Sequence, residues 1–245
     1  MGWLAGYEDL VRLNEPLAPH CWFQIGGPAE YFAEPRSVEE LERLLRRAHD
    51  NGVPVRILGG GSNLLVLEAG VEGLVIRLAD PAFAEVQVDG NRLRAGAGVK
   101  LGHLISTSVR EGLAGLETLV GIPGTLGGAL HGNAGSRGGD IGQWTCRATV
   151  MTQTGEIIER QREDLVFAYR QSSLDELVIL SADFQLERGD PEELTKRMQK
   201  QWIVKKASQP LGHQSAGCIF KNPRGMSAGM LIDQAGLKGT RIGSA

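Results

Sequence analysis

Glycine constrains the fold of this chain more than any other residue type. It accounts for 34 of the 245 residues, about twice the share of roughly 7% in an average protein. The glycines cluster in loops between apolar segments, and glycine is favoured where a backbone takes a positive φ or approaches a ligand closely. The sequence therefore predicts a turn-rich fold whose glycine loops bind a cofactor. Composition alone leaves open a turn-rich fold without a cofactor.

The bulk composition excludes several classes of protein. Apolar residues make up 42% of the chain and the net charge is -3, with no long basic run that would indicate a nucleic-acid interface. Three scattered cysteines and five histidines show neither a disulfide framework nor metal-ligand spacing. The N-terminus lacks an apolar signal core, and no apolar run approaches the ~18 residues that span a bilayer. We expect a cytoplasmic protein that binds neither metal nor nucleic acid and does not insert into a membrane.

Local patterns predict the first helix in detail. Ser37 is a suitable N-cap, Glu40 stands three residues further on, and apolar residues then recur on one face until Asn51-Gly52. In contrast, residues 115–142 are dense in glycine and predict a long irregular stretch, which is often functional. The other expected elements are hairpins over 84–98 and 147–160, strands at 54–58, 74–76 and 177–186, and helices at 101–109, 190–207 and 228–234.

A loop of three consecutive glycines is the first candidate binding site. Successive backbone N–H groups in such a loop converge on a phosphate, and two polar side chains add further donors. A flexible tight turn is the alternative interpretation. Neither a P-loop nor the dinucleotide fingerprint is present, because Gly96-x-Gly98 departs from the latter. The loop consists of Gly59, Gly60, Gly61, Ser62 and Asn63.

A second loop alternates apolar residues with glycines, as suits a backbone pressed against a flat apolar ring. Two such loops on one β-rich domain favour a dinucleotide over a mononucleotide, although structural turns remain an alternative. The candidate cofactor-binding residues here are Gly121, Ile122, Pro123, Gly124, Thr125, Gly127, Gly128, Asn133 and Gly135.

Two further positions could take part in chemistry. Arg170, after Tyr169, could supply an always-charged fork for an oxyanion, or it could be a surface arginine. Cys218 lies in a glycine-flanked loop with Lys221 three residues on, and a nearby cation raises the reactivity of a thiol. An inert, small buried cysteine is the alternative.

Five segments in this order resemble one family, UDP-N-acetylenolpyruvoylglucosamine reductase, also called UDP-N-acetylmuramate dehydrogenase. The resemblance covers residues 14–245 and is carried by residues 22–29, 59–63, 121–129 with 133–135, 169–170 and 217–223. The short interval between Arg170 and Cys218 resembles the family subtype that lacks an extra tyrosine-bearing loop over the substrate.

The resemblance implies an α+β fold. It consists of an FAD-binding domain of the vanillyl-alcohol oxidase / p-cresol methylhydroxylase (PCMH) type, followed by a small, incomplete α/β substrate domain. We expect an N-terminal lead-in at 1–23, the FAD domain at 24–188 and the partial substrate domain at 189–245. The glycine loops would hold FAD noncovalently.

The resemblance also implies a reaction, in which NADPH is the hydride donor and the enolpyruvyl UDP-sugar is reduced to UDP-N-acetylmuramate for peptidoglycan and cell-wall synthesis. Arg170 matches the arginine that stabilises the carbanion or enolate. Cys218 stands where many members have a proton-donating serine, and a thiol is a stronger acid than an alcohol. Tyr169, Lys221 and Asn222 would bind the substrate, and we expect a monomer that acts on small molecules.

The C-terminal end departs from the family pattern. Members continue beyond the segment matching residues 236–243, and the continuation carries a catalytic glutamate to which no residue of this sequence corresponds. We therefore expect a fragment or a truncated form in which FAD binding survives better than catalysis. Another flavin oxidoreductase of the same FAD fold and a catalytically impaired flavin-binding remnant are the alternative functions.

Overall fold

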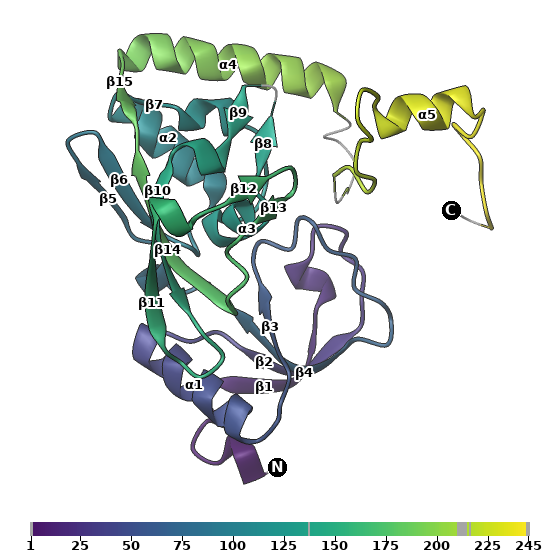
Figure 1. The fold of residues 1–245 in the computed structure, drawn as a ribbon. Coiled ribbons are helices and arrows are strands. Elements are labelled where there is room, and N and C mark those ends of the chain that lie inside the picture. The colour runs from purple at the N-terminus through teal and green to yellow at the C-terminus, as the bar shows by residue number, and fades with distance from the viewer. Residues whose placement is uncertain (1, 137, 210–214, 216, 244–245) are drawn as a thin grey trace.

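The computed structural model describes residues 2–136, 138–209, 215 and 217–243, and Figure 1 shows two β-sheets with helices packed around them. The first sheet has the strand order β1-β2-β4-β3, with β2 and β3 parallel to β4 and β1 antiparallel to β2. Its strands are β1 (Val11–Pro16), β2 (Pro28–Ala33), β3 (Val55–Leu58) and β4 (Val71–Arg77).

The second sheet is antiparallel throughout, in the order β11-β10-β14-β6-β5. Helix α3 (Leu126–His131) packs against β14 and β6 of this sheet, and α2 (Leu101–Arg110) contacts α3. Both expected hairpins are confirmed as β5–β6 and β10–β11. The five strands are β5 (Val86–Asp89), β6 (Arg92–Gly96), β10 (Thr145–Met151), β11 (Ile157–Gln161) and β14 (Val178–Gln185).

Helix α1 (Val38–Asp50) begins where the sequence predicts. The Oγ of Ser37 accepts a hydrogen bond from the backbone N–H of Glu40 at 3.2 Å. The carboxylate of Glu40 accepts from the backbone N–H of Arg36 at 2.8 Å, one residue before the expected partner in a capping box. Its apolar face, formed by Leu41, Leu44, Leu45 and Ala48, is fully buried.

One hydrophobic core joins the two sheets. Leu44 of α1, Leu93 of β6 and Phe184 of β14 belong to the same buried cluster. Shorter elements complete this part of the chain: the pairs β7 (Leu113–Ala114) with β15 (Glu187–Arg188), β8 (Gly135–Ser136) with β9 (Gly139–Asp140) and β12 (Phe167–Ala168) with β13 (Gln171–Ser172), and the 3-10 helices Gly2–Leu4, Ala18–His20, Pro81–Phe83, Leu116–Leu119, Ile141–Gln143 and Arg162–Asp164.

The expectation that residues 115–142 are irregular is wrong, because this stretch contains α3, two 3-10 helices and the β8–β9 pair. The N–H groups of Leu126 and Gly127 donate to the carbonyls of Val99 and Ala97, both at 2.9 Å. A methyl group on Gly127 would lie 3.1 Å from Cβ of Ala97. Glycine has a low intrinsic helix propensity, but close packing against the chain after β6 favours it at this position of α3.

The chain after residue 188 is organised differently. Helix α4 (Pro191–Ser208) packs onto the rest through Leu194, which forms a small buried cluster with Val109 and Ala114. Helix α5 (Ala228–Gln234) and the loops around it project from the side of the molecule, and no described residue between 217 and 243 is buried. Part of the expected loop over 212–223 lies outside the described residues.

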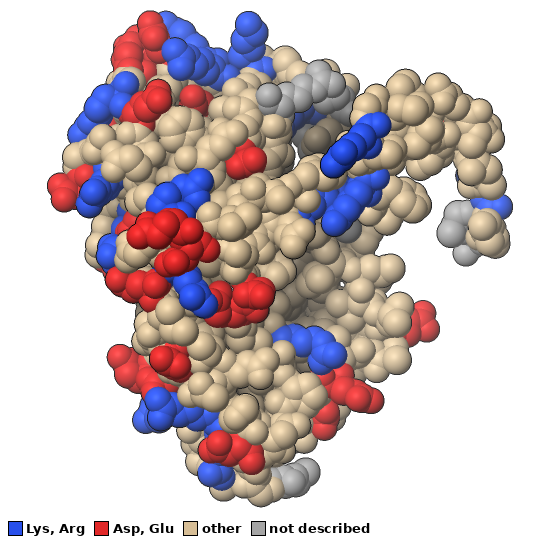
Figure 2. All heavy atoms as spheres, viewed as in Figure 1, with Lys and Arg blue, Asp and Glu red and all other residues tan. Residues whose placement is uncertain are grey.

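Acidic and basic side chains are interspersed over the face shown in Figure 2, and lysine and arginine side chains gather where the C-terminal segment leaves the body. Within the described residues, no helix combines the length and the apolar character needed to cross a membrane.

Candidate active site

The two glycine loops predicted to bind a cofactor lie against each other. Residues 59–63 follow β3, and residues 121–125 precede α3. The Oγ of Ser62 donates to the carbonyl of Pro123 at 3.3 Å. A methyl group on Gly60 would lie 2.7 Å from Cα of Gly124, so the two backbones touch at a distance that a larger residue would prevent.

A third segment completes this cradle. The N–H of Trp22 donates to the carbonyl of Gly61 at 3.0 Å, and a methyl group on Gly61 would overlap the carbonyl oxygen of His20. Gly61 and Gly124 have φ values of +63° and +110°, which side chains rarely allow. The cradle is open to solvent, because four of its residues are exposed: Gly60, Asn63, Pro123 and Gly128.

Thr125 connects the two loops to α3. A methyl group on Gly59 would lie 2.8 Å from Oγ1 of Thr125, so the threonine hydroxyl packs against the first loop. Ile122 is half-buried beside it, and its N–H donates to the carbonyl of Leu119. This backbone is rich in glycine and is held in place by contacts such as those of Thr125 and Ile122. It therefore suits the close approach of a dinucleotide.

The two remaining residues predicted at the cofactor make contacts within the protein. Asn133 is buried with φ +45°, and its Nδ2 donates to the carbonyl of Ala168 at 3.0 Å while its Oδ1 accepts from the N–H of Gly142 at 3.2 Å. Gly135 lies in the β8–β9 pair, where a methyl group would lie 2.8 Å from Cβ of Asp140.

The structure brings the predicted catalytic residues together. Tyr169 and Arg170 form the two-residue turn between β12 and β13, and Arg170 has φ +57°. The Nη2 of Arg170 donates to the carbonyl of Cys218 at 2.6 Å, across 48 residues of sequence. The N–H of Asn222 donates to the hydroxyl of Tyr169 at 3.2 Å. The thiol of Cys218 is free, and both Cys218 and the neighbouring Lys221 are exposed.

Two residues of α4 that the sequence analysis missed support the second glycine loop. A methyl group on Gly121 would lie 2.8 Å from the ring of Trp202, and the Nζ of Lys205 donates to the carbonyl of Val120 at 2.6 Å. Burial lowers the pKa of Lys205, because it disfavours the charged ammonium. Since Lys205 stands in a helix rich in lysine and arginine, no pattern distinguished it from its solvated neighbours.

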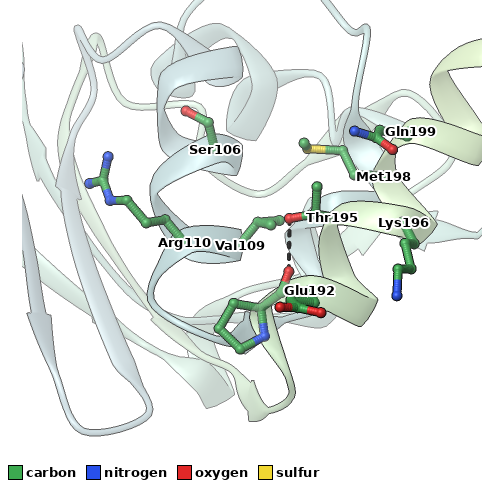
Figure 3. A pocket seen from close by; sticks show the side chains of 9 residues that line it. Ser106, Val109, Arg110, Glu192, Thr195, Lys196, Met198 and Gln199 are labelled. Carbon is green, nitrogen blue, oxygen red and sulfur yellow. Dashed lines mark hydrogen bonds between the residues drawn. The ribbon is translucent and has the colours of Figure 1, made fainter.

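A surface cavity of about 560 Å³ lies elsewhere, between α2 and α4 (Figure 3). Ser106 and Arg110 line it from α2, and Thr195 and Gln199 line it from α4. The hydroxyl of Thr195 donates to the carbonyl of Pro191 at 2.7 Å in its own helix. No residue predicted for the cofactor or substrate lines this cavity, so the candidate active site is the glycine cradle with the Arg170 turn.

Comparisons with known proteins agree with this geometry. Residues 29–160 match the family model described as "FAD binding domain", and residues 209–245 match "UDP-N-acetylenolpyruvoylglucosamine reductase, C-terminal domain". The reductase of Rhodopirellula baltica is 43% identical over 239 residues, which cover 96% of this chain and 78% of that protein. The chain belongs to the UDP-N-acetylenolpyruvoylglucosamine reductase family.

Other members of the reductase family support the same assignment. The reductase of Halalkalibacterium halodurans is 40% identical, with 96% of this chain and 78% of that protein covered. The crystal structure of the reductase from Thermus caldophilus superposes with a TM-score of 0.82 at 39% identity, covering 96% of this chain and 82% of that one.

More distant structures share the fold alone. The 6-hydroxy-D-nicotine oxidase of Arthrobacter nicotinovorans matches with a TM-score of 0.53 at 23% identity, covering 75% of this chain and 40% of that one. Together with the reductase structure and the FAD-binding family model, this likeness confirms the predicted α+β fold with a PCMH-type FAD-binding domain. The cradle of touching glycine backbones is the local feature that fits FAD.

Proposed function

We propose that this chain catalyses the NADPH-dependent reduction of UDP-N-acetylglucosamine enolpyruvate to UDP-N-acetylmuramate in peptidoglycan precursor synthesis. The observation that carries the proposal is the hydrogen bond from the guanidinium of Arg170 to the backbone carbonyl of Cys218. It brings the two predicted catalytic residues together in a family member with an FAD-binding domain. Bound noncovalently, FAD supplies the acceptor of hydride from NADPH and the donor of hydride to the enolpyruvyl double bond.

The glycine cradle is the proposed cofactor site. Backbone N–H groups of residues 59–61, with the side chains of Ser62 and Asn63, would bind the pyrophosphate. Backbone of residues 121–125, 127 and 128 would hold the flavin ring. Asn133 uses both ends of its amide for bonds to Ala168 and Gly142, and Gly135 pairs within β8–β9, so we assign both residues to holding neighbouring backbone rather than to direct contact with FAD.

Arg170 and Cys218 divide the chemistry that the protein supplies. Addition of hydride to the double bond leaves an electron pair beside the substrate carboxylate, as a carbanion or enolate. The fixed charge of Arg170 stabilises that pair, and Cys218 then donates a proton to the carbon, so that hydride and proton together saturate the bond. Tyr169, Lys221 and Asn222 bind the UDP-sugar, and the ammonium of Lys221 suits an anionic group.

The proposal extends to organisation and setting. Residues 24–188 form the FAD domain and residues 189–245 belong to the substrate domain, with residues 1–23 as the lead-in. We propose a cytoplasmic monomer that binds small molecules and no nucleic acid. Free thiols at Cys21, Cys146 and Cys218 support a reducing compartment.

The test combines flavin spectroscopy with turnover. Purified protein incubated with FAD should show flavin absorbance, and it should oxidise NADPH when the enolpyruvyl UDP-sugar is added. Arg170→Ala should keep the flavin and lower turnover by about 10²–10³-fold, the typical loss on removing a charge-stabilising donor. Arg43→Ala, an exposed arginine on α1, is the control and should leave both unchanged. A protein that stays colourless with excess FAD, or one that consumes oxygen without NADPH, would contradict the proposal.

A further inference from the structure

The turn that carries Arg170 is small and conformationally costly. The hairpin pairs Phe167 with Ser172 and Ala168 with Gln171, leaving Tyr169 and Arg170 as its two central residues. Arg170 has φ +57°, which lies in the left-handed region that a residue with a side chain rarely adopts. A two-strand hairpin of this size is not stable alone, so the surrounding structure must hold it.

Two hydrogen bonds fasten both strands of this hairpin to the C-terminal end of α3. The Nδ2 of Asn133 donates to the carbonyl of Ala168 at 3.0 Å, directly before the turn. The hydroxyl of Ser172, two residues after Arg170, donates to the carbonyl of His131 at 3.0 Å. His131 is the last residue of α3, and Asn133 follows two residues later.

Asn133 has the chemistry that this position requires. Its amide donates to Ala168 and accepts from the N–H of Gly142, and one planar group satisfies both partners. Asparagine also tolerates the left-handed backbone, here φ +45°, better than most residues. Aspartate would keep the acceptor but lose the donor.

The opposite end of α3 belongs to the proposed cofactor loop. The helix starts after Thr125, and the N–H groups of Leu126 and Gly127 anchor it to Val99 and Ala97. Six helical residues span about 9 Å, so α3 is a short rigid element between the glycine loop and the arginine turn.

We infer that Asn133 is a positioning residue for Arg170, holding the arginine turn at a fixed place relative to the glycine loop at the other end of α3. The inference rests on the proposed function, in which Arg170 stabilises negative charge during substrate reduction. A misplacement of about 1 Å at a reacting centre can lower a rate by roughly 10²-fold, so the tether matters for the rate without touching the substrate.

Two substitutions at Asn133 distinguish the hydrogen bond that its side-chain amide donates from the one that it accepts. Asn133→Asp removes the donor to Ala168 and keeps the acceptor for Gly142, whereas Asn133→Gly removes both and tolerates the positive φ. The matched control is Ser136→Ala, which removes a nearby bond of 2.7 Å to the carbonyl of Thr118 that does not reach the hairpin.

The first measurement follows the two half-reactions of the FAD-loaded protein by stopped flow. Flavin reduction by NADPH does not use Arg170 and should be unchanged in all three variants, as should flavin content. Reoxidation by the enolpyruvyl UDP-sugar should slow by about 10- to 100-fold in both Asn133 variants and not in Ser136→Ala. In an Arg170→Ala background, Asn133→Asp should cause no further slowing. Loss of flavin, or an equal further slowing in that background, would overturn the inference.

The second measurement does not depend on activity. Hydrogen exchange of the amides in residues 166–173 should be faster in Asn133→Asp than in wild type, with the strands of the second sheet unchanged. Unchanged exchange in the hairpin would overturn the inference. A wild-type protein that fails to bind FAD or to be reoxidised by the UDP-sugar would instead sink the proposed function, and the exchange experiment would still decide whether Asn133 holds the turn.

Discussion

The body of the molecule, residues 2–188, and the C-terminal segment, residues 217–243, contribute to the same candidate site but are stabilised differently. The body has a core that joins both sheets, with side chains such as Phe184 and Leu93 fully buried. In the segment, by contrast, Ile219 is 79% exposed and Phe220 is 61% exposed. Hydrogen bonds from Arg170 to Cys218 and from Asn222 to Tyr169 join the segment to the body.

The difference teaches that the glycine cradle is preorganised by the core of the body, whereas the placement of Cys218 relies on a few polar contacts. Burying apolar surface stabilises by about 25 cal/mol per Å², while one hydrogen bond contributes about 0.5–1.5 kcal/mol net. Changes in the body should therefore affect the whole fold, and equivalent changes in the segment should remain local.

A pair of phenylalanine truncations should show the largest contrast. Phe184→Ala leaves a cavity in the core and should lower the free energy of unfolding by about 3–5 kcal/mol. Phe220→Ala alters an exposed side chain and should change it by no more than about 0.5 kcal/mol. Urea unfolding followed by tryptophan fluorescence measures both. Equal losses would mean that the segment is part of the cooperative unit.

Gly61 in the body and Gly225 in the segment, which both have a positive φ, provide the next test. Alanine at either position carries backbone strain of about 1–2 kcal/mol. At Gly61 the new methyl group would also overlap the carbonyl of His20, adding about 1–3 kcal/mol of overpacking. At Gly225 nothing lies within 4 Å of it. Gly61→Ala should lose bound FAD and global stability. Gly225→Ala should keep both, because its strain stays within the C-terminal segment and the body does not unfold with it. Flavin absorbance and urea titration would reveal the difference. Full retention of FAD by Gly61→Ala would place the cofactor elsewhere.

The sequence predicted the elements whose signals are local. The apolar face of α1 and its Ser37 cap, and both long hairpins, depend on residues close together in the chain, and the structure confirms them. Helix α3 was missed because Gly127 inside it packs closely against Ala97, a contact 30 residues away that no local propensity encodes.

The site was predicted residue by residue but not as an arrangement. Family motifs predicted Arg170 and Cys218 as catalytic candidates, yet their spacing in the sequence does not predict the hydrogen bond from the Arg170 side chain to the Cys218 carbonyl. The β12–β13 turn was missed because two-residue hairpin turns favour glycine or asparagine at positive φ, and here an arginine takes that position. The support by Trp202 and Lys205 of α4 had no sequence signal at all.

Two serine caps test the comparison at a finer level. Ser37 caps α1 and Ser227 caps α5, each accepting from a backbone N–H at 3.2 and 3.1 Å respectively. Ser37→Ala should lower the free energy of unfolding by about 1 kcal/mol, because α1 is part of the core. Ser227→Ala should leave it unchanged and only speed hydrogen exchange within α5, which has no buried residue. A global effect of Ser227→Ala would show that α5 unfolds together with the body.

The smallest effect is expected at Lys205, where α4 meets the second glycine loop. Burial lowers the pKa of Lys205 in the folded protein below the value of about 10.4 for an unfolded lysine. Between these two values the unfolded state binds more protons, so this group's contribution to stability rises with pH. Below the folded pKa the cost of burying the ammonium is fully present.

Two variants remove the titration at this position. Lys205→Met has no ionisable side chain, and the guanidinium of Lys205→Arg stays charged at every pH of the experiment. Urea unfolding at pH 7 and pH 10 should therefore show a relative gain in stability at high pH for the wild type over both variants, smaller than the loss on removing the Ser37 cap. Identical pH slopes for the wild type and Lys205→Met would show that the ammonium reaches solvent, and that α4 holds the Gly121 loop through Trp202 packing rather than through a desolvated lysine.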